Sequence, residues 1–292
     1  MGTVYIAIIM LFRIVQHLFN KRSSRLVGGI TEFVSYSAFR QLASSMMGLA
    51  LILVTGSGFK FDMLTVLISV FSGIMLVASM GCSLFAMQSG TVAITSMFAT
   101  SGLIIPCVCG IVMFGIPMSA MQWVGIGIFL VSAYMLAMDA KTECCNFSIK
   151  TLLLLIGSFL SNGLVMLAQQ MFSFYRPEGN VSMFSFLSFG IVGVIMLIAS
   201  FTMNIKTQNH TRLPRRLVGY GLALSFAVFV INQLAVKAAA LVPPAVLFSF
   251  INGGSTIIAA IIAFLCFGER LTVKKVAGII VGIASLIIIK IF

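Results

Sequence analysis

Ionisable side chains inside long apolar stretches are the first candidates for chemistry in this sequence, and Arg13 is the strongest case among them. It lies about eleven residues, or roughly 16 Å of helix, into its apolar run. A charge at that depth in a bilayer is costly and suggests a function. A guanidinium there can hold a carboxylate or phosphate through forked hydrogen bonds. The alternatives are a partner for helix-end carbonyls or a side chain that extends to the interface.

Polar uncharged side chains form a second group, which suits a neutral or zwitterionic solute because amides both donate and accept hydrogen bonds. The candidate binding residues are Arg13, Gln16, His17, Gln169, Gln170, Asn232, Gln233 and Asn252. His17 can also couple transport to protons, because imidazole titrates near neutral pH. Hydrogen bonds between helices are the alternative role for these amides. Arg40 and Lys237 are expected to extend along their aliphatic stems to an interface.

Acidic residues are absent from the middle of every apolar run, and this restricts the solute. All six fall in loops or at run ends: Glu32, Asp62, Asp139, Glu143, Glu178 and Glu269. A proton-coupled exporter of lipophilic cations needs a carboxylate in its cavity, so the solute is expected to be neutral, zwitterionic or anionic. The sequence has no phosphate-binding loop of the ATPase type. Its six cysteines lack zinc-site spacing and histidine partners, so neither a cofactor nor a metal is expected.

Long apolar helices must position these groups. Apolar residues make up 60% of the chain and charged residues 8%, far from soluble values. A membrane-spanning helix needs about 20 mainly apolar residues. Ten such runs are present, at roughly 2–20, 30–54, 65–87, 91–115, 119–138, 151–174, 183–203, 217–238, 243–267 and 272–292. The composition therefore predicts an all-α integral membrane protein with ten transmembrane helices.

The pattern of apolar residues repeats along the sequence at a fixed offset. Phe114-Gly115 and Phe267-Gly268 are 153 residues apart (267 − 114), and the same shift places Gln16-His17 on Gln169-Gln170. This predicts two repeats, residues 1–146 and 150–292, with five helices each. Because five is odd, the second repeat must enter the membrane from the opposite face, which makes the repeats inverted, with a solute site at their interface. Pro106 and Gly253-Gly254 interrupt the fourth and ninth runs, either as interrupted helices do at such sites or as simple kinks.

Basic residues predict the orientation of the chain. Twelve follow odd-numbered runs, against three on the other face: Lys21, Arg22, Arg25, Lys141, Lys150, Lys206, Arg212, Arg215, Arg216, Arg270, Lys274 and Lys275, against Lys60, Arg176 and Lys290. Positive loops stay in the cytoplasm. The count therefore places both termini outside.

The residues before the last run, Phe267-Gly268-Glu269-Arg270-Leu271-Thr272, followed by Lys275 and Gly278-x-x-x-Gly282, resemble the Gly-Glu-Arg-Leu signature of the drug/metabolite transporter superfamily. More narrowly, the chain resembles its ten-helix EamA-like members, which Gln16-His17-Leu18-Phe19-Asn20-Lys21 and Arg40 also fit. The resemblance implies two inverted five-helix repeats, a central cavity and alternating access, with small metabolites exported or exchanged. Two features depart from it. Gly115-Ile116-Pro117-Met118 lacks the charges of the signature, and the family usually keeps both termini in the cytoplasm.

The expected function is a secondary transporter, not an enzyme, that moves a small neutral, zwitterionic or anionic metabolite such as an amino acid across the plasma membrane. The open alternatives are an intramembrane enzyme acting on lipid-soluble substrates, or a channel or scaffold. The expected partners are the solute and the lipid bilayer. Nucleic acid is not expected, because the basic residues are dispersed among short loops. Gly278-x-x-x-Gly282 permits close helix packing, so both a monomer and a homodimer stay open.

Overall fold

The computed structural model is all-helical throughout the residues that it describes, which are 1–56, 58–59, 62–88, 92–137, 148–207, 213–267 and 272–291. The helices are α1 (Gly2–Ser24), α2 (Ile30–Thr55), α3 (Met63–Gln88), α4 (Val92–Ser101), α5 (Ile104–Phe114), α6 (Ala120–Ala137), α7 (Ile149–Tyr175), α8 (Val181–Thr207), α9 (Arg215–Ala239), α10 (Pro244–Ser249), the π-helical turn η1 (Phe250–Gly254), α11 (Ser255–Phe267) and α12 (Val273–Ile291). The predicted all-α class is confirmed for this part of the chain. The signature Gly268-Glu269-Arg270-Leu271 lies outside it.

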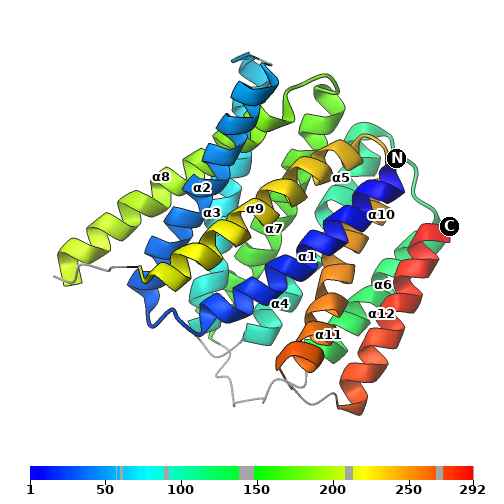
Figure 1. The fold of residues 1–292 in the computed structure, drawn as a ribbon. Helices are drawn as coiled ribbons and strands as arrows, with labels where there is room; N and C mark the ends of the chain where they lie inside the picture. Colours follow the sequence, from blue (N-terminus) through cyan, green and yellow to red (C-terminus); the bar gives the residue numbers. More distant parts are fainter. Residues whose placement is uncertain are drawn as a thin grey trace.

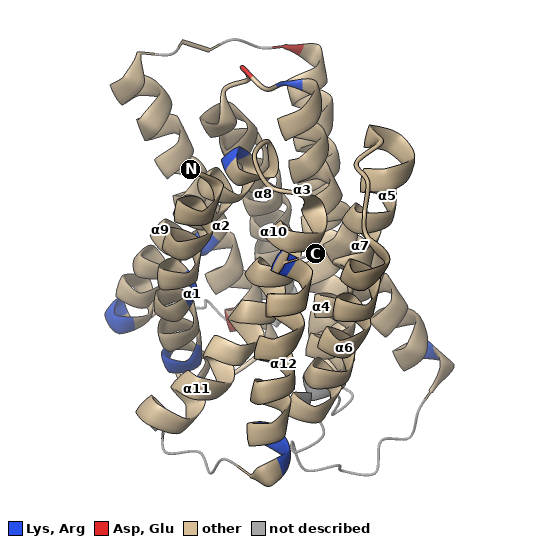
Figure 2. Cartoon of the chain, turned by 90° about the vertical axis from the view of Figure 1, so that its right-hand side faces the viewer, with Lys and Arg blue, Asp and Glu red and all other residues tan. Residues whose placement is uncertain are grey.

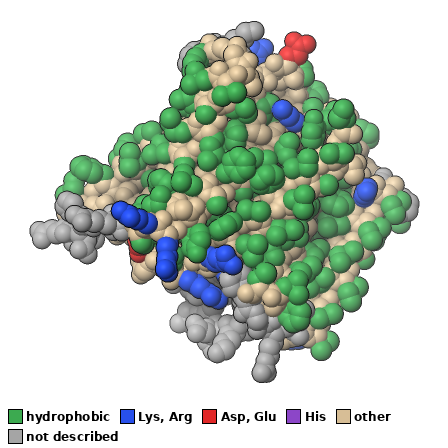
Figure 3. Space-filling model, in the orientation of Figure 1, with side chains coloured by type: hydrophobic (Ala, Val, Ile, Leu, Met, Phe, Trp, Pro, Cys, Tyr) green, Lys and Arg blue, Asp and Glu red, His purple; other side chains and the backbone are tan. Residues whose placement is uncertain are grey.

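The helices have the length and composition of membrane spans. Within the described residues, eight helical segments are long and apolar enough to cross a bilayer, counting α4 with α5, and α10 with η1 and α11, as single segments. Each of the ten predicted apolar runs coincides with one helix or with one of these interrupted segments. Apolar side chains cover most of the outer face seen in Figure 3. The chain is therefore an α-helical integral membrane protein.

Helices far apart in the sequence pack in pairs (Figure 1). The most extensive pairings are α2 with α8, α3 with α7, α6 with α12 and α1 with α9. One core cluster joins α1, α6, α10 and α12 around Ile9, Phe129 and Phe248. A second joins α3, α7, α8 and α9, where the rings of Phe172 and Phe184 stack with centroids 4.7 Å apart. The two sequence halves are thus interleaved rather than separate.

The fourth predicted span is interrupted between α4 and α5, at Gly102-Leu103. The sequence placed this break at Pro106, which instead lies in the first turn of α5. Proline is tolerated there, and because it has no N–H it cannot bond to the carbonyl of Gly102. That carbonyl accepts from the N–H of Ile105 at 3.0 Å instead. The proline therefore causes the break one turn before its own position.

The ninth predicted span changes its helical form at the predicted place. Pro244 begins α10, and the backbone then widens into the π-helical turn that contains Gly253 and Gly254. Such turns are rare and occur often at functional sites. Both interrupted segments contribute buried residues to the first core cluster, Leu103 at the α4–α5 break and Ile251 in η1.

Basic side chains are divided unequally between the two ends of the molecule (Figures 2 and 3). One end, where α1 and α2 are joined, carries Lys21, Arg22, Arg25, Lys150, Arg215, Arg216, Lys274 and Lys275 among the described residues, and the other carries Arg176, Lys237 and Lys290. The remaining basic residues of the loop count (Lys60, Lys141, Arg212, Arg270 and the side chain of Lys206) lie outside the described part. The unequal division has the direction that the sequence count predicts.

Orientation can be tested with single cysteines at the two ends. Glu178, between α7 and α8, and Ser24, at the end of α1, are both exposed. If the positively charged end is cytoplasmic, Glu178→Cys should react with an impermeant thiol reagent added to intact cells, and Ser24→Cys only after permeabilisation. The reverse pattern would establish the orientation that is usual in EamA-like transporters.

Candidate functional site

Two cavities open at opposite ends of the helix bundle. The α1–α2 cavity has a volume of about 760 Å³ and includes His17, Arg40 and Ser83 in its lining. The α7–α8 cavity has a volume of about 810 Å³ and includes Arg176, Ser182 and Gln233. Both volumes are in the range of small-molecule sites, which is about 300–1,000 Å³. The candidate site residues are best described by their relation to these cavities.

The α1–α2 cavity reaches toward the middle of the bundle. At 1.5 Å per residue, His17 lies about 10 Å from the end of α1 at Ser24, and Arg40 about 15 Å from the start of α2 at Ile30. His17 Nε2 lies 2.9 Å from the Ser255 hydroxyl at the start of α11. The predicted role of His17 at a solute cavity is therefore compatible with its position, and its ring is held by the ninth span.

Arg40 lies in this cavity, contrary to the interpretation that it extends to an interface. Its Nε is buried and has no hydrogen-bond partner, and its guanidinium carbon is 5.6 Å from the centre of the Tyr36 ring. The Tyr36 side chain is buried against α9 and the end of α1. Stacking on an aromatic ring is favourable for a guanidinium and holds it in one orientation. Arg40 is thus a cationic group of the cavity wall, which the sequence analysis did not include among the binding residues.

Arg13 does not line either of the two cavities. Its Nη1 donates to Oε1 of Gln16 at 2.8 Å, and its Nε is buried without a partner. Residues four apart on a helix share a face, so Arg13 lies one turn deeper than His17 on the same face of α1. The charged group that the sequence placed in the solute site is therefore adjacent to the inner end of the α1–α2 cavity.

Three other candidates form a hydrogen-bonded chain below the α7–α8 cavity. Gln169 Nε2 donates to Oδ1 of Asn232 at 2.7 Å, and Asn232 Nδ2 donates to the Ser185 hydroxyl at 2.8 Å. Gln233 Nε2 lies 3.3 Å from the Ser182 hydroxyl and 3.4 Å from that of Ser185. This network joins α7, α8 and α9, and because Ser182 and Gln233 also line the cavity, it forms a polar floor there. The two serines were missed, since serine is too frequent in this sequence to carry a signal.

Gln170 and Asn252 lie away from both cavities. Gln170 is 2% exposed, and neither its Oε1 nor its Nε2 has a hydrogen-bond partner. It packs near Gly110 of α5, where an added Cβ would be 3.2 Å from Gln170 Nε2. Asn252, within η1, donates to the Phe248 carbonyl at 3.0 Å and lies 3.3 Å from Met166 Sδ. The structure therefore does not gather all eight predicted residues into one pocket.

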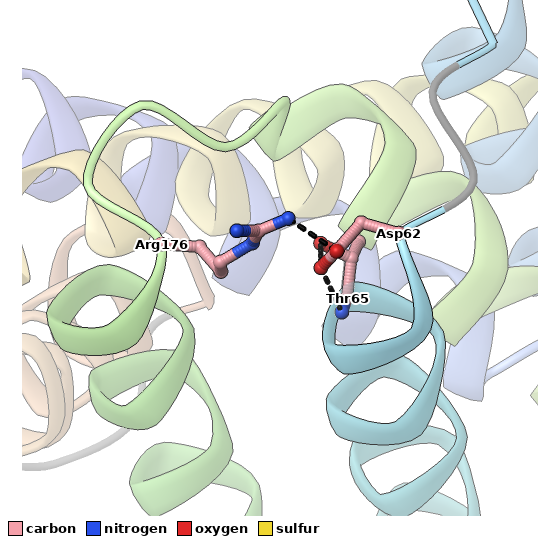
Figure 4. Close-up of polar contacts among 3 residues, drawn as sticks. All are labelled: Asp62, Thr65 and Arg176. Atoms are coloured by element: carbon pink, nitrogen blue, oxygen red, sulfur yellow. Dashed lines mark hydrogen bonds and ion pairs between the residues drawn. The ribbon is translucent and has the colours of Figure 1, made fainter.

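An ion pair bridges the mouth of the α7–α8 cavity (Figure 4). Arg176 Nη2, after α7, lies 2.5 Å from Oδ1 of Asp62, just before α3. The other carboxylate oxygen of Asp62 accepts from the backbone N–H of Thr65 at 3.1 Å and so caps α3. The two side chains are 38% and 34% exposed. The pair links two connections that come from different halves of the sequence.

The ion pair is expected to limit access to the α7–α8 cavity. Asp62→Asn keeps an acceptor for Thr65 but removes the charge, and Arg176→Gln removes the charge from the other side. Because a partly exposed pair contributes about 0.2–1 kcal/mol, each change should raise the rate of thiol labelling at Ser182→Cys by a factor of about 1.4 to 5. The double variant should add nothing to either single change. Unchanged labelling rates would show that the pair does not restrict access.

Comparisons with known proteins give the fold only. Among solved structures, 28 chains match. One of them, described as "Crystal structure of protein", superposes with a TM-score of 0.75 over 98% of this chain and 96% of its own, at 10% sequence identity. No family model and no curated protein matches the sequence. The architecture is thus shared with known structures.

Proposed function

We propose that the protein is a secondary transporter of the plasma membrane that moves a small neutral, zwitterionic or anionic metabolite by alternating access. The observation that carries the proposal is the pair of cavities, which enter from opposite ends and stop at polar groups of the interior. A carrier needs access from each side to a shared interior site, but not from both at once. His17 lies at the inner part of one cavity, and the Gln169–Asn232 network lies below the other.

The arrangement of helices supports two inverted repeats, residues 1–146 and 150–292, of five spans each. The offset of 153 residues places the first residue of α6, Ala120, on Val273, the first residue of α12. It also pairs α1 with α7, α2 with α8 and α3 with α9. If the halves are exchanged, the contact of α1 with α9 becomes that of α7 with α3, and the α2–α8 and α6–α12 contacts map onto themselves. Such pseudo-symmetry is typical of carriers that alternate between two mirrored states.

The interrupted spans support the same function. The α4–α5 break and the π-helical turn η1 belong to corresponding spans of the two repeats, and both contribute buried residues to the core. Interruptions of this kind free backbone groups and provide hinges where two halves can rock against each other. A drug/metabolite carrier of the EamA-like type is the family that agrees with this arrangement and with the sequence resemblance.

Reconstitution into liposomes tests the proposal. Vesicles loaded with one unlabelled solute should accumulate its radiolabelled form by counterflow, in a panel of amino acids, organic acids and phosphorylated sugars. Counterflow and saturation distinguish a carrier from a channel, because a channel dissipates a gradient without exchanging one molecule for another. Protein-free vesicles are the control. If no solute of the panel exchanged faster than in those vesicles, the transporter proposal would be wrong.

A further inference from the structure

The α1–α2 cavity carries positive charge that its described lining does not neutralise. Arg40 faces it with a buried, unpartnered Nε. Among the described lining residues there is no Asp or Glu. The nearest described acid on α2, Glu32, is occupied at the exposed start of the helix, where it accepts from the N–H of Gly28 at 2.7 Å. The cavity is therefore complementary to an anion.

Arginine cannot relieve this situation by losing its proton, because its guanidinium stays charged at every physiological pH. An unpaired charge that is largely removed from water is strongly unfavourable unless an opposite charge or several hydrogen bonds compensate it. The Tyr36 ring, 5.6 Å from the guanidinium, supplies only part of this compensation. A bound anion would supply the rest, and a carboxylate matches the planar fork of the guanidinium best.

Part of the remaining wall of the cavity is apolar, and the rest carries serine and asparagine side chains. Phe33 on α2, Met80 and Leu84 on α3, and Ile262 on α11 all face the same space as Arg40. A fully hydrated anion such as phosphate gains nothing from this surface. A molecule with one carboxylate and an apolar body would bury its body against these side chains, which is favourable because apolar surface is removed from water. The two surfaces together specify an amphiphilic ligand.

We propose that the α1–α2 cavity binds a small organic carboxylate with an apolar tail, its carboxylate paired with the guanidinium of Arg40 and its tail against Met80, Leu84 and Ile262. The inference rests on the proposed function in one respect, since it names the class of solute that the carrier would move. The binding site itself is defined by the cavity and its charge.

Binding to the purified protein tests the charge requirement. The probes are 4-methylpentanoate, 4-methylpentanamide and 4-methylpentylamine, which share their apolar body and differ in charge. We expect the carboxylate to raise the thermal unfolding temperature of the protein in detergent, and the amide and amine to leave it unchanged. Equal shifts with all three probes would overturn the proposal. Hexadecanoate, used as a fourth probe, distinguishes a lipid-derived carboxylate from a small free solute. Binding of hexadecanoate but not of 4-methylpentanoate would also overturn the proposal.

Variants of Arg40 test the position of the site. Arg40→Gln should weaken 4-methylpentanoate binding about tenfold to hundredfold, as expected for the loss of charge-assisted hydrogen bonds. Arg40→Lys keeps the positive charge but cannot form the forked pair of hydrogen bonds. Its affinity for 4-methylpentanoate should therefore lie between those of Arg40→Gln and the unmodified protein. Arg22→Gln is the matched control, because Arg22 is an exposed arginine at the same end of the molecule and outside the cavity lining. Equal weakening by Arg22→Gln would overturn the assignment to Arg40.

A second measurement does not depend on the folding of the Arg40 variants. Ala263 of α11 lines the cavity, and Ala263→Cys, in a Cys266→Ser background, provides a thiol there. We expect 4-methylpentanoate to slow its labelling and the amide to have no effect. Absence of protection would overturn the site.

The liposome assay separates the two proposals. Binding and protection without counterflow of 4-methylpentanoate or any other solute would support the site and contradict the transporter. Counterflow of another solute, with no carboxylate binding, would support the transporter and contradict the site.

Discussion

Replacing Arg13 with Ala is expected to abolish exchange of an anionic solute while the amount of protein inserted in the membrane stays unchanged. Arg13 lies one turn deeper than His17 on the same face of α1, and its Nε is buried without a partner. A solute that advances from the α1–α2 cavity toward the middle of the bundle therefore meets Arg13 after His17. The variant should lose counterflow and retain binding in the cavity, because Arg13 is outside the cavity lining.

The counterpart of this experiment is Arg40→Gln, for which binding itself should be weakened. If Arg13→Ala exchanged an anionic solute at the unmodified rate, Arg13 would have only a packing role through its 2.8 Å bond to Gln16. Arg13→Lys adds a control for charge alone, since lysine retains a positive charge but cannot form the forked contact. Recovery of part of the exchange rate in that variant would indicate that the charge matters more than the geometry.

The positions of the helices could be predicted from the sequence because hydrocarbon thickness and backbone hydrogen bonding leave few alternatives. A run of about 20 apolar residues in a bilayer must satisfy its backbone internally and so becomes a helix. Even the interrupted spans were indicated by Pro106 and by Gly253-Gly254. The location of the first break was not, because the effect of a proline falls on the carbonyl one turn earlier, here that of Gly102.

The content of the site was harder to predict, because depth along a helix says nothing about which way a side chain points. Arg13 and Arg40 are both deep within apolar runs, yet only Arg40 lines a described cavity. That difference depends on the rotation of α1 and α2 against α3, α9 and α11, which is set by packing between distant segments. Sequence spacing within one helix does not contain this information.

The equivalence of Gln16-His17 with Gln169-Gln170 was interpreted as evidence for one symmetric site. His17 lies in the α1–α2 cavity, while Gln169, the counterpart of its neighbour Gln16, belongs to the network below the α7–α8 cavity. The inverted arrangement proposed above accounts for the separation. Equivalent residues near the ends of equivalent helices are carried to opposite ends of the molecule when one repeat is turned over. Only residues close to the centre of the spans can meet in a shared site. This again favours Arg13 and the interrupted segments as parts of that site.

A close approach of two helix backbones in the described bundle provides the other large expected effect. Gly163 of α7 lies against the α4–α5 break, where a Cβ on Gly163 would be 2.5 Å from the Gly102 carbonyl oxygen and 2.9 Å from Ile105 Cβ. Asn162, the preceding residue, donates to the carbonyl of Ala99. We expect Gly163→Ala to lower the free energy of unfolding by about 1–3 kcal/mol, as overpacking does elsewhere. Thermal unfolding in detergent measures the change.

The matched control is Gly219→Ala, at an exposed helical position of α9 where an added Cβ meets nothing within 4 Å. That change should be neutral or stabilising by about 0.5–1 kcal/mol, because alanine restricts the unfolded chain and favours the helix. The contrast between the two variants isolates the contact from the general effect of replacing glycine. Equal unfolding temperatures would contradict the close packing of α7 on the break. The penalty at Gly163 arises because its obstacle is backbone, which cannot rotate away as a flexible side chain can.

If the α4–α5 break is also a hinge of the transport cycle, the same methyl group should slow counterflow at temperatures where the protein is still folded.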